Sequence, residues 1–176
     1  MGILKGVIIF MGVKWKTTKN QFPKMITQIE KLNKRSVEVG VIEGEHKYIA
    51  SILEYGCTIN VTPKMRAFLH YHGLHLSKNT KTIKIPERSF LRASHDKYAD
   101  EVLKKAGMVT GQVLDGKMST DQLLDMIGKI LRSKVKDYAT DLTNPPNHPY
   151  TIEQKGSSNP LVDTKEMIRG ISWRKK

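Results

Sequence analysis

The spacing of apolar positions changes several times along the chain and divides it into short helices and strands. Residues 20–34 carry an apolar stripe at helical spacing, with Pro23 in the first turn, where its missing N–H costs nothing. Alternation over residues 37–42 then predicts a strand. Helical spacing returns over residues 46–55, and Gly56 suits the left-handed end of that helix.

The next stretch mixes both periods. Residues 59–63 alternate and predict a short strand. Alternation also occurs at 65–69 and 83–85, which favours a hairpin with its turn over 74–81. The alternative is a short helix at 63–72.

The second half of the chain is mainly helical. The pattern predicts one long helix over residues 88–115 and a second that opens at Ser119. Ser119 and Gln122 have the spacing of a capping box, in which each side chain satisfies an N–H group of the other residue. The apolar stripe of the first helix consists of Tyr98, Val102, Ala106, Val109 and Val113.

Residues 142–161 show no period. Asn144–Pro149 is too rich in proline for a helix or a central strand, and 156–160 reads as flexible. A helical turn at 163–168 and a strand at 170–174 complete the chain.

Helices and strands alternate here without a βαβ repeat, which predicts the α+β class. We expect a small, mainly antiparallel sheet packed against two long helices. The domain organisation we expect is an N-terminal arm, residues 1–19, and a single domain, 20–176, with a long loop at 141–162.

The chain is strongly basic: 30 Lys and Arg against 17 Asp and Glu give a formal charge of +13. This excess suggests acidic partners, nucleic acid or protein, although a Lys-rich soluble surface is an equal alternative. Cys57 is the single cysteine, which excludes an internal disulfide and fits a reducing cytoplasm. The apolar stretch near the N-terminus is too short to span a bilayer, so we expect no membrane association.

Candidate chemistry is sparse. His70 and His72 would share one face of a strand, but no thiol or carboxylate stands at ligand spacing with them or with His75, and we expect no metal and no cofactor. The sequence contains no nucleophile elbow, zinc-protease motif or phosphate loop, so we expect no enzyme and no catalytic residue. A metal-assisted nuclease through His70 and His72 is the remaining enzymatic alternative.

Cations are frequent on both long helices. Lys129, Arg132 and Lys136 share a helical face, yet no helix-turn-helix, RNA-recognition or oligonucleotide-barrel signature accompanies them. Non-specific contact with duplex DNA is therefore more plausible than sequence-specific recognition.

Several motifs, in order, resemble bacteriophage tail-completion proteins, also described as minor tail components. Residues 85–92, Ile-Pro-Glu-Arg-Ser-Phe-Leu-Arg, are similar to the family segment I-P-x-R-P-F-L-R, with Ser89 in place of the second proline. Residues 159–172 are similar to P-L-x-D-T-G-x-L-x-x-S-I, with Lys165 in place of glycine, which suggests a helical turn that starts without a pause. Residues 37–41 and 49–56 match V-x-V-G-V and A-x-I-L-E-x-G.

The resemblance implies a non-enzymatic structural subunit of a phage neck that completes the tail and joins it to the head. Such a subunit would be assembled in the host bacterial cytoplasm and reside in the virion. Its partners would be copies of itself in a six-fold or twelve-fold ring, neighbouring neck, connector and tail-terminator or tail-tube proteins, and double-stranded DNA that passes through the lumen without specific recognition. The interface candidates are Arg88, Phe90, Arg92, Pro145, Pro146, Tyr150, Asp163 and Trp173.

Other roles for these residues stay open. Phe90 could fill the core while the arginines cap neighbouring carbonyls, and Asp163 and Thr164 are natural helix N-caps. We expect residues 1–19, 72–82 and 141–162 to become ordered in the assembled particle. The alternatives to a neck ring are a tail-terminator or collar ring of a tail or tail-like bacteriocin, and a basic non-specific DNA-binding protein.

Overall fold

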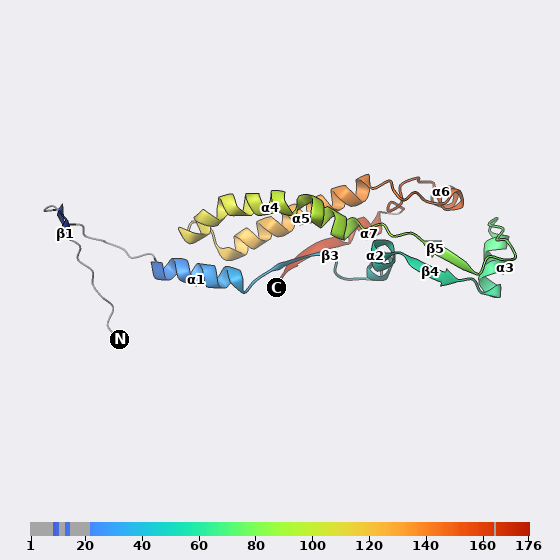
Figure 1. Cartoon of the computed structure of the whole chain (residues 1–176), viewed down its shortest axis with the longest axis horizontal. Helices are drawn as coiled ribbons and strands as arrows, with labels where there is room; N and C mark the ends of the chain where they lie inside the picture. Colours follow the sequence, from blue (N-terminus) through green and yellow to red (C-terminus); the bar gives the residue numbers. More distant parts are fainter. Residues whose placement is uncertain (1–8, 11–12, 15–21, 164) are drawn as a thin grey trace.

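The computed structural model describes residues 9–10, 13–14, 22–163 and 165–176 as an elongated body with a projecting arm (Figure 1). The N-terminal arm expected at residues 1–19 lies outside the described residues, apart from the antiparallel pair β1 (Ile9–Phe10) and β2 (Val13–Lys14).

Two long helices form the main layer of the body. Helices α4 (Phe90–Leu114) and α5 (Thr120–Asp141) lie side by side, and α1 (Phe22–Asn33) runs beneath their joined end (Figure 1). The predicted capping box starts α5: Ser119 Oγ accepts from Gln122 N at 3.1 Å, and Gln122 Oε1 accepts from Ser119 N at 2.8 Å. Hydrogen bonds from Lys105 and Lys134 lower the pKa of Glu101 to about 2 and tie α4 to α5.

A two-stranded antiparallel ribbon supports α5. Strand β3 (Val37–Val41) pairs with β6 (Ile171–Lys175), so that Val39 lies opposite Trp173. Helices α2 (His46–Tyr55) and α7 (Glu166–Arg169) complete the core beside this ribbon. The buried residues that form the core cluster are Val41, Ala50, Phe90, Val135, Ala139, Leu161, Met167, Ile168 and Ile171.

The α+β class is confirmed, with two long packed helices against antiparallel strands. The described strands form three separate two-stranded ribbons instead of one sheet. Strand β4 (Cys57–Asn60) pairs with β5 (Thr82–Ile85), and this ribbon carries α3 (Pro63–Tyr71) away from the body (Figure 1). We call residues 57–85 the β4–β5 arm.

The hairpin expected within residues 65–85 is wrong, and the rival short helix is correct. Thr62 Oγ1 accepts from Met65 N at 3.1 Å and so caps α3, while Pro63 occupies its first turn. These start signals outweigh the alternation at 65–69. Strand β5 therefore pairs with β4, whose bounds also lie earlier than the predicted 59–63.

The expectation that residues 142–161 lack regular structure is wrong for their middle. Helix α6 (Pro149–Lys155) starts at a proline, with His148 Nδ1 accepting from Tyr150 N at 3.3 Å, and ends at Gly156 with a φ of 64°. Proline and glycine here mark the first and last positions of a helix instead of interrupting one.

The C-terminal turn also starts differently from the prediction. Helix α7 begins at Glu166, and its N-cap is Lys165, not Asp163, while Thr164 lies outside the described residues. Lys165 has a φ of 64°, a left-handed conformation that glycine adopts without strain. The backbone therefore does leave the right-handed helical conformation just before α7, although the residue there is a lysine and not a glycine.

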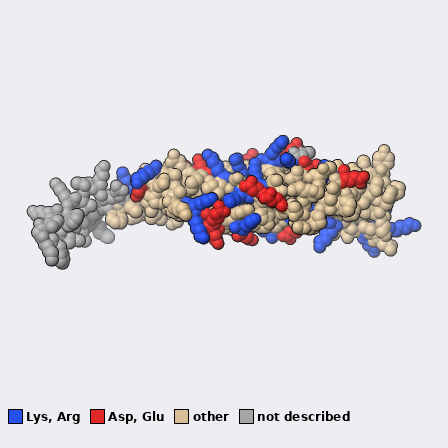
Figure 2. Space-filling model, turned by 90° about the horizontal axis from the view of Figure 1, so that it is seen from above, with Lys and Arg blue, Asp and Glu red and all other residues tan. Residues whose placement is uncertain are grey.

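Charges are distributed unevenly over the surface. Figure 2 shows Lys and Arg interleaved with Asp and Glu over the middle of the molecule. Ion pairs of the described chain include Lys175–Asp125 at 2.8 Å and Arg174–Glu38 at 2.7 Å. Within the described part of the chain, no helix is both long and apolar enough to cross a membrane.

Candidate assembly interface

A buried carboxylate joins α2 to the start of α4. Glu54, 2% exposed, accepts hydrogen bonds from Ser89 Oγ at 2.8 Å, Leu91 N at 2.8 Å and Arg92 N at 3.0 Å. Arg92 Nε adds a contact of 3.1 Å to the same carboxylate. Ser89 occupies the N-cap position but makes no capping bond of its own, so Glu54 caps α4 from another helix.

The electrostatics of Glu54 favour its charged form. Burial alone would raise its pKa, but the hydrogen bonds from Leu91, Arg92 and Ser89 outweigh burial and hold the pKa below its ordinary value. Arg92 also donates to Glu87 at 2.8 Å and stacks over the Tyr55 ring at 4.7 Å. The end of α2 and the start of α4 are therefore rigidly connected.

Arg88 fastens the proline-rich segment to the same place. Its guanidinium, in a residue 5% exposed, donates to Pro145 O at 2.9 Å, Pro146 O at 3.0 Å and Asn147 Oδ1 at 3.1 Å. Burial lowers the pKa of Arg88, and the three oxygens that accept its hydrogen bonds are all neutral. Arg88 thus holds residues 145–147 against the body.

Replacing Arg88 by Met should release this segment. The stem of the side chain is retained, but three carbonyl or amide oxygens lose their donors. We expect amide hydrogen exchange over 142–150 to become at least about ten-fold faster, because local opening then costs about 1.4 kcal/mol less. Exchange in α5 should stay unchanged, and equal acceleration in both segments would contradict a local role.

Two of the motifs noted in the sequence contact each other in the folded chain. Glu54 of the 49–56 motif binds Ser89 and Arg92 of the 85–92 motif. Asn159, which opens the C-terminal motif, accepts hydrogen bonds through its side chain from Leu161 N at 2.9 Å and Val162 N at 3.0 Å, and so orders its own turn.

Comparison of the chain with models of known families, with curated proteins and with solved structures found no match.

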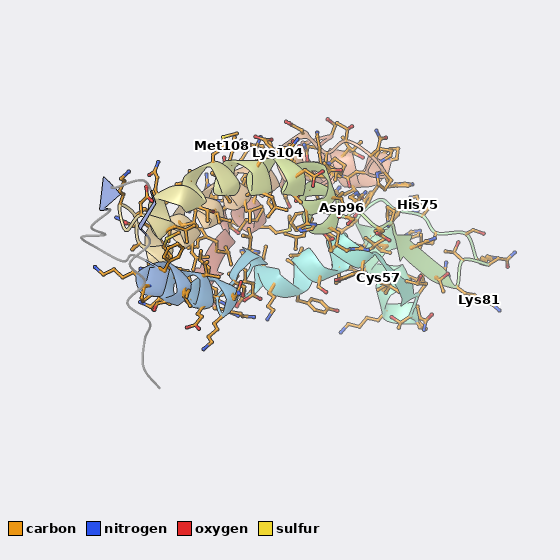
Figure 3. All side chains as sticks on the ribbon, turned by 60° about the vertical axis from the view of Figure 1, so that its left-hand side comes forward. Cys57, His75, Lys81, Asp96, Lys104 and Met108 are labelled. Atoms are coloured by element: carbon orange, nitrogen blue, oxygen red, sulfur yellow. The ribbon has the colours of Figure 1, made fainter. Side chains whose placement is uncertain are left out.

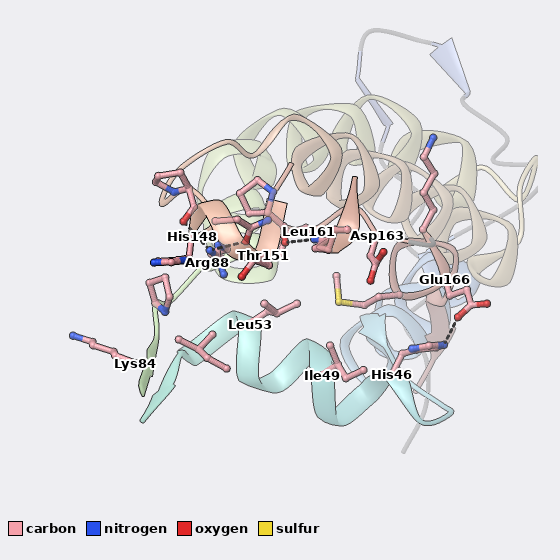
Figure 4. Close-up of a pocket in the computed structure, with 18 of the residues that line it drawn as sticks. His46, Ile49, Leu53, Lys84, Arg88, His148, Thr151, Leu161, Asp163 and Glu166 are labelled. Atoms are coloured by element: carbon pink, nitrogen blue, oxygen red, sulfur yellow. Dashed lines mark hydrogen bonds and ion pairs between the residues drawn. The ribbon is translucent and has the colours of Figure 1, made fainter. Parts of the chain in front are cut away.

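A groove of about 790 Å³ runs along α2 (Figure 4). Its apolar floor includes Ile49 and Leu53 of α2. Figure 4 places Lys84 and Arg88 near one end, and His46, Asp163 and Glu166 near the other, where His46 Nε2 lies 3.5 Å from Glu166 Oε2. The end toward the β4–β5 arm therefore carries Lys84 and Arg88, whereas Asp163 and Glu166 lie at the other end of a groove that Lys155 and Lys165 also line.

The β4–β5 arm contains no acidic residue. Its five Lys and Arg are Lys64, Arg66, Lys78, Lys81 and Lys84, and its histidines are His70, His72 and His75. Arg66 is used internally, because it donates to Leu76 O at 3.2 Å, Ser77 O at 2.8 Å and Thr80 O at 2.6 Å. It thereby stiffens the tip of the arm.

The four lysines of the arm point to solvent, and no ion pair involves them within the described chain. Figure 3 shows Lys81 extending from the far end of the arm. Two large rings accompany this charge, since Phe68 is 60% exposed and Tyr71 is 85% exposed. A rigid, basic protrusion with exposed aromatic rings is a surface built for contact with a partner.

A second exposed surface lies at the start of α2. Glu43 and Glu45 are exposed in the turn before the helix, and no ion pair involves them among the described residues. Tyr48 is 74% exposed and Ile49 is 47% exposed on the adjoining turn of α2. We call Glu43, Glu45, Asp163 and Glu166 the acidic end.

The interface candidates named from the sequence lie in three environments. Phe90 is 0% exposed and fills the core, and Arg88 caps carbonyls, as the alternative reading held. Trp173 packs against α5 at Gly128. The candidates that remain at the surface, fully or in part, are Arg92, Pro145, Pro146, Tyr150, Asp163 and Trp173.

The histidines are placed differently from the prediction. His70 and His72 lie at the end of a helix and not on one face of a strand, and the His70 and His75 rings meet edge to face at 4.4 Å. Among the described residues, no group of three or more His, Cys, Asp or Glu could hold a metal ion. Cys57 is a free, partly buried residue at the start of β4.

Local sequence patterns do not identify Glu54, Asn147 and Asn159 as residues that organise this region. They do not identify the arm as a surface either, because the alternation at 65–69 favours a hairpin over helix α3. The signal was present in the sequence: no acid occurs between Cys57 and Ile85.

Proposed function

We propose that the protein is a non-enzymatic structural subunit of a phage neck ring, one that completes the tail and joins it to the head. It acts in the virion, after assembly in the host bacterial cytoplasm. Its partners are copies of itself, neighbouring neck, connector and tail-terminator or tail-tube proteins, and the DNA that passes through the lumen.

One observation carries this proposal: the β4–β5 arm projects from the body with its aromatic rings and lysines turned to solvent. A lone globular domain gains nothing from exposing Phe68 and Tyr71 at the end of a stiffened protrusion. A ring subunit does, because a head-to-tail contact needs a projecting surface on each copy and a different receiving surface on the next.

The contacts of the motif residues support the same proposal. Glu54 and Arg88 fix the base of the arm and the 145–147 segment to α4. Contact surfaces held by a rigid frame can meet a neighbour without paying a large ordering cost. The expectation that residues 72–82 and 141–162 become ordered only on assembly is not kept, because Arg66 and Arg88 already bind these segments within the single chain.

Electron microscopy and mass measurement of the purified full chain test the proposal. We expect closed rings, and we expect particles that lack the protein to accumulate as separate heads and tails. Rings found on tails that fail to end correctly would favour the tail-terminator or collar alternative. A chain that stays monomeric at all concentrations would contradict the proposal.

A second function, non-specific DNA binding, is favoured by one observation: the acid-free arm with its unpaired lysines. A DNA binder of this kind shifts duplex DNA as a monomer, with an affinity that falls steeply as salt rises. A ring that lets DNA slide should not grip phosphates, so we expect weak retention at physiological salt.

A further inference from the structure

We propose that the β4–β5 arm of one copy docks onto the acidic end of the next copy, at the start of its α2. This inference rests on the proposed ring function, and it names the two surfaces that meet in the ring. It also assigns the arm's positive charge to a protein partner, a second copy of this chain, instead of nucleic acid.

The arm supplies the basic half of the contact. Lys64, Lys78 and Lys81 are exposed near its tip, and the arm holds no carboxylate to neutralise them. Elsewhere in the described chain, cations are often paired within the molecule, as Lys134 is with Glu101 and Lys175 is with Asp125. The lysines of the arm are therefore available to bind carboxylates of another molecule.

The acidic end supplies the other half. Glu43 and Glu45 are exposed in the turn just before His46, and His46 contacts Glu166 at the head of the groove. Asp163 interacts electrostatically with Lys155, and Glu166 lies against His46. Glu43 and Glu45 are exposed and take part in no ion pair among the described residues, so these two carboxylates are the ones we assign to the contact.

Apolar groups match on the two halves. The arm presents Phe68 and Tyr71 beside its lysines, and the acidic end presents Tyr48 and Ile49 on the first turn and a half of α2. Aromatic anchors surrounded by complementary charge are typical of protein–protein contacts. A DNA duplex would satisfy the lysines but would leave both rings exposed, because its bases are stacked on each other.

The two surfaces lie at opposite ends of one rigid run of structure. Helix α2 has 10 residues and so spans about 15 Å, with the acidic turn before it and the ribbon of the arm after it. Figure 1 shows the same order, from β3 through α2 to β4 and α3. Because both surfaces face outward at different ends, the contact is heterologous and can repeat from copy to copy around a ring.

A charge-reversal series tests the docking. The arm variant Lys64→Glu/Lys78→Glu/Lys81→Glu should raise the concentration at which rings dissociate by at least about ten-fold, because it places like charges against the acidic end. The matched control Lys104→Glu/Lys129→Glu/Arg132→Glu reverses three exposed cations on α4 and α5 and should keep the ring. Sedimentation measures ring formation, and circular dichroism verifies that both variants fold.

A rescue experiment is the second half of the test. Glu43→Lys/Glu45→Lys alone should also weaken the ring, and combining it with the arm variant in one chain should restore assembly, since both partners of the contact are then reversed. If the combined variant does not assemble, the separate variants have lost some other contact, and the proposed pairing of the arm with the acidic end is overturned.

The remaining outcomes separate this inference from the proposed function. If the wild-type chain forms no ring, the proposed function fails. If the wild-type and arm variants form equally stable rings, the proposed function stands and the docking inference is overturned. Rings that persist while the arm variant loses binding to a duplex oligonucleotide would assign the arm to DNA instead.

Discussion

Glu54→Ala is expected to lower the free energy of unfolding by about 3 kcal/mol, since it removes a buried carboxylate that caps a helix and pairs with an arginine. The N–H groups of Leu91 and Arg92 and the hydroxyl of Ser89 would all lose their acceptor. Urea unfolding followed by circular dichroism measures the change.

The matched control is Glu153→Ala, which truncates an exposed acid on α6 that forms no ion pair with the described part of the chain. Its expected effect is within about 0.5 kcal/mol, as for surface substitutions in general. Equal losses in Glu54→Ala and Glu153→Ala would show that the Glu54 network contributes nothing special to stability.

The same residue makes stability depend on pH. Hydrogen bonds that outweigh burial lower the pKa of Glu54 in the folded protein below its ordinary value of 4.5. The stabilisation is therefore fully present above pH 4.5 and is lost as the pH falls through the lower folded pKa. The difference in urea midpoint between the wild-type and Glu54→Gln proteins should shrink as the pH drops from 7 to 3.

Local patterns predicted the helices well where one face is buried. The period of 3.6 residues and the caps at Ser119 and Gly56 correctly indicated α2, α4 and α5, because those signals depend on neighbours in the sequence. The same reasoning misjudged residues 63–71, where apolar side chains at alternate positions happened to follow a proline start signal. A short helix on an arm buries no face, so its period carries little information.

Contacts between distant segments could not be predicted in the same way. Glu54 read as one more acid in a helix, yet it caps a helix that begins 36 residues later, at Phe90. The sequence allows Arg88 to cap neighbouring carbonyls, but only the fold shows that these are the carbonyls of Pro145 and Pro146. Interface prediction was limited for the same reason: burial decides which motif residues are available, and burial is a property of the whole fold.

Gly128→Ala is expected to destabilise the protein strongly, although it replaces only a hydrogen by a methyl group. A Cβ at Gly128 would collide with the indole ring of Trp173, which lies directly against α5. Trp173 belongs to β6, whose pairing with β3 fixes the ring in place, so the ring cannot withdraw without disturbing the ribbon. We expect a loss of about 3 kcal/mol in the free energy of unfolding, despite the better helix propensity of alanine.

Two glycines in α4 provide the matched controls for Gly128. Gly107 and Gly111 have open space where a Cβ would stand, so alanine at either position should stabilise the protein by up to about 1 kcal/mol. In a Trp173→Leu background, Gly128→Ala should cost much less than in the wild-type chain, because the colliding ring is gone. A cost that stays the same in both backgrounds would mean that the helix and ribbon are not held together by this contact.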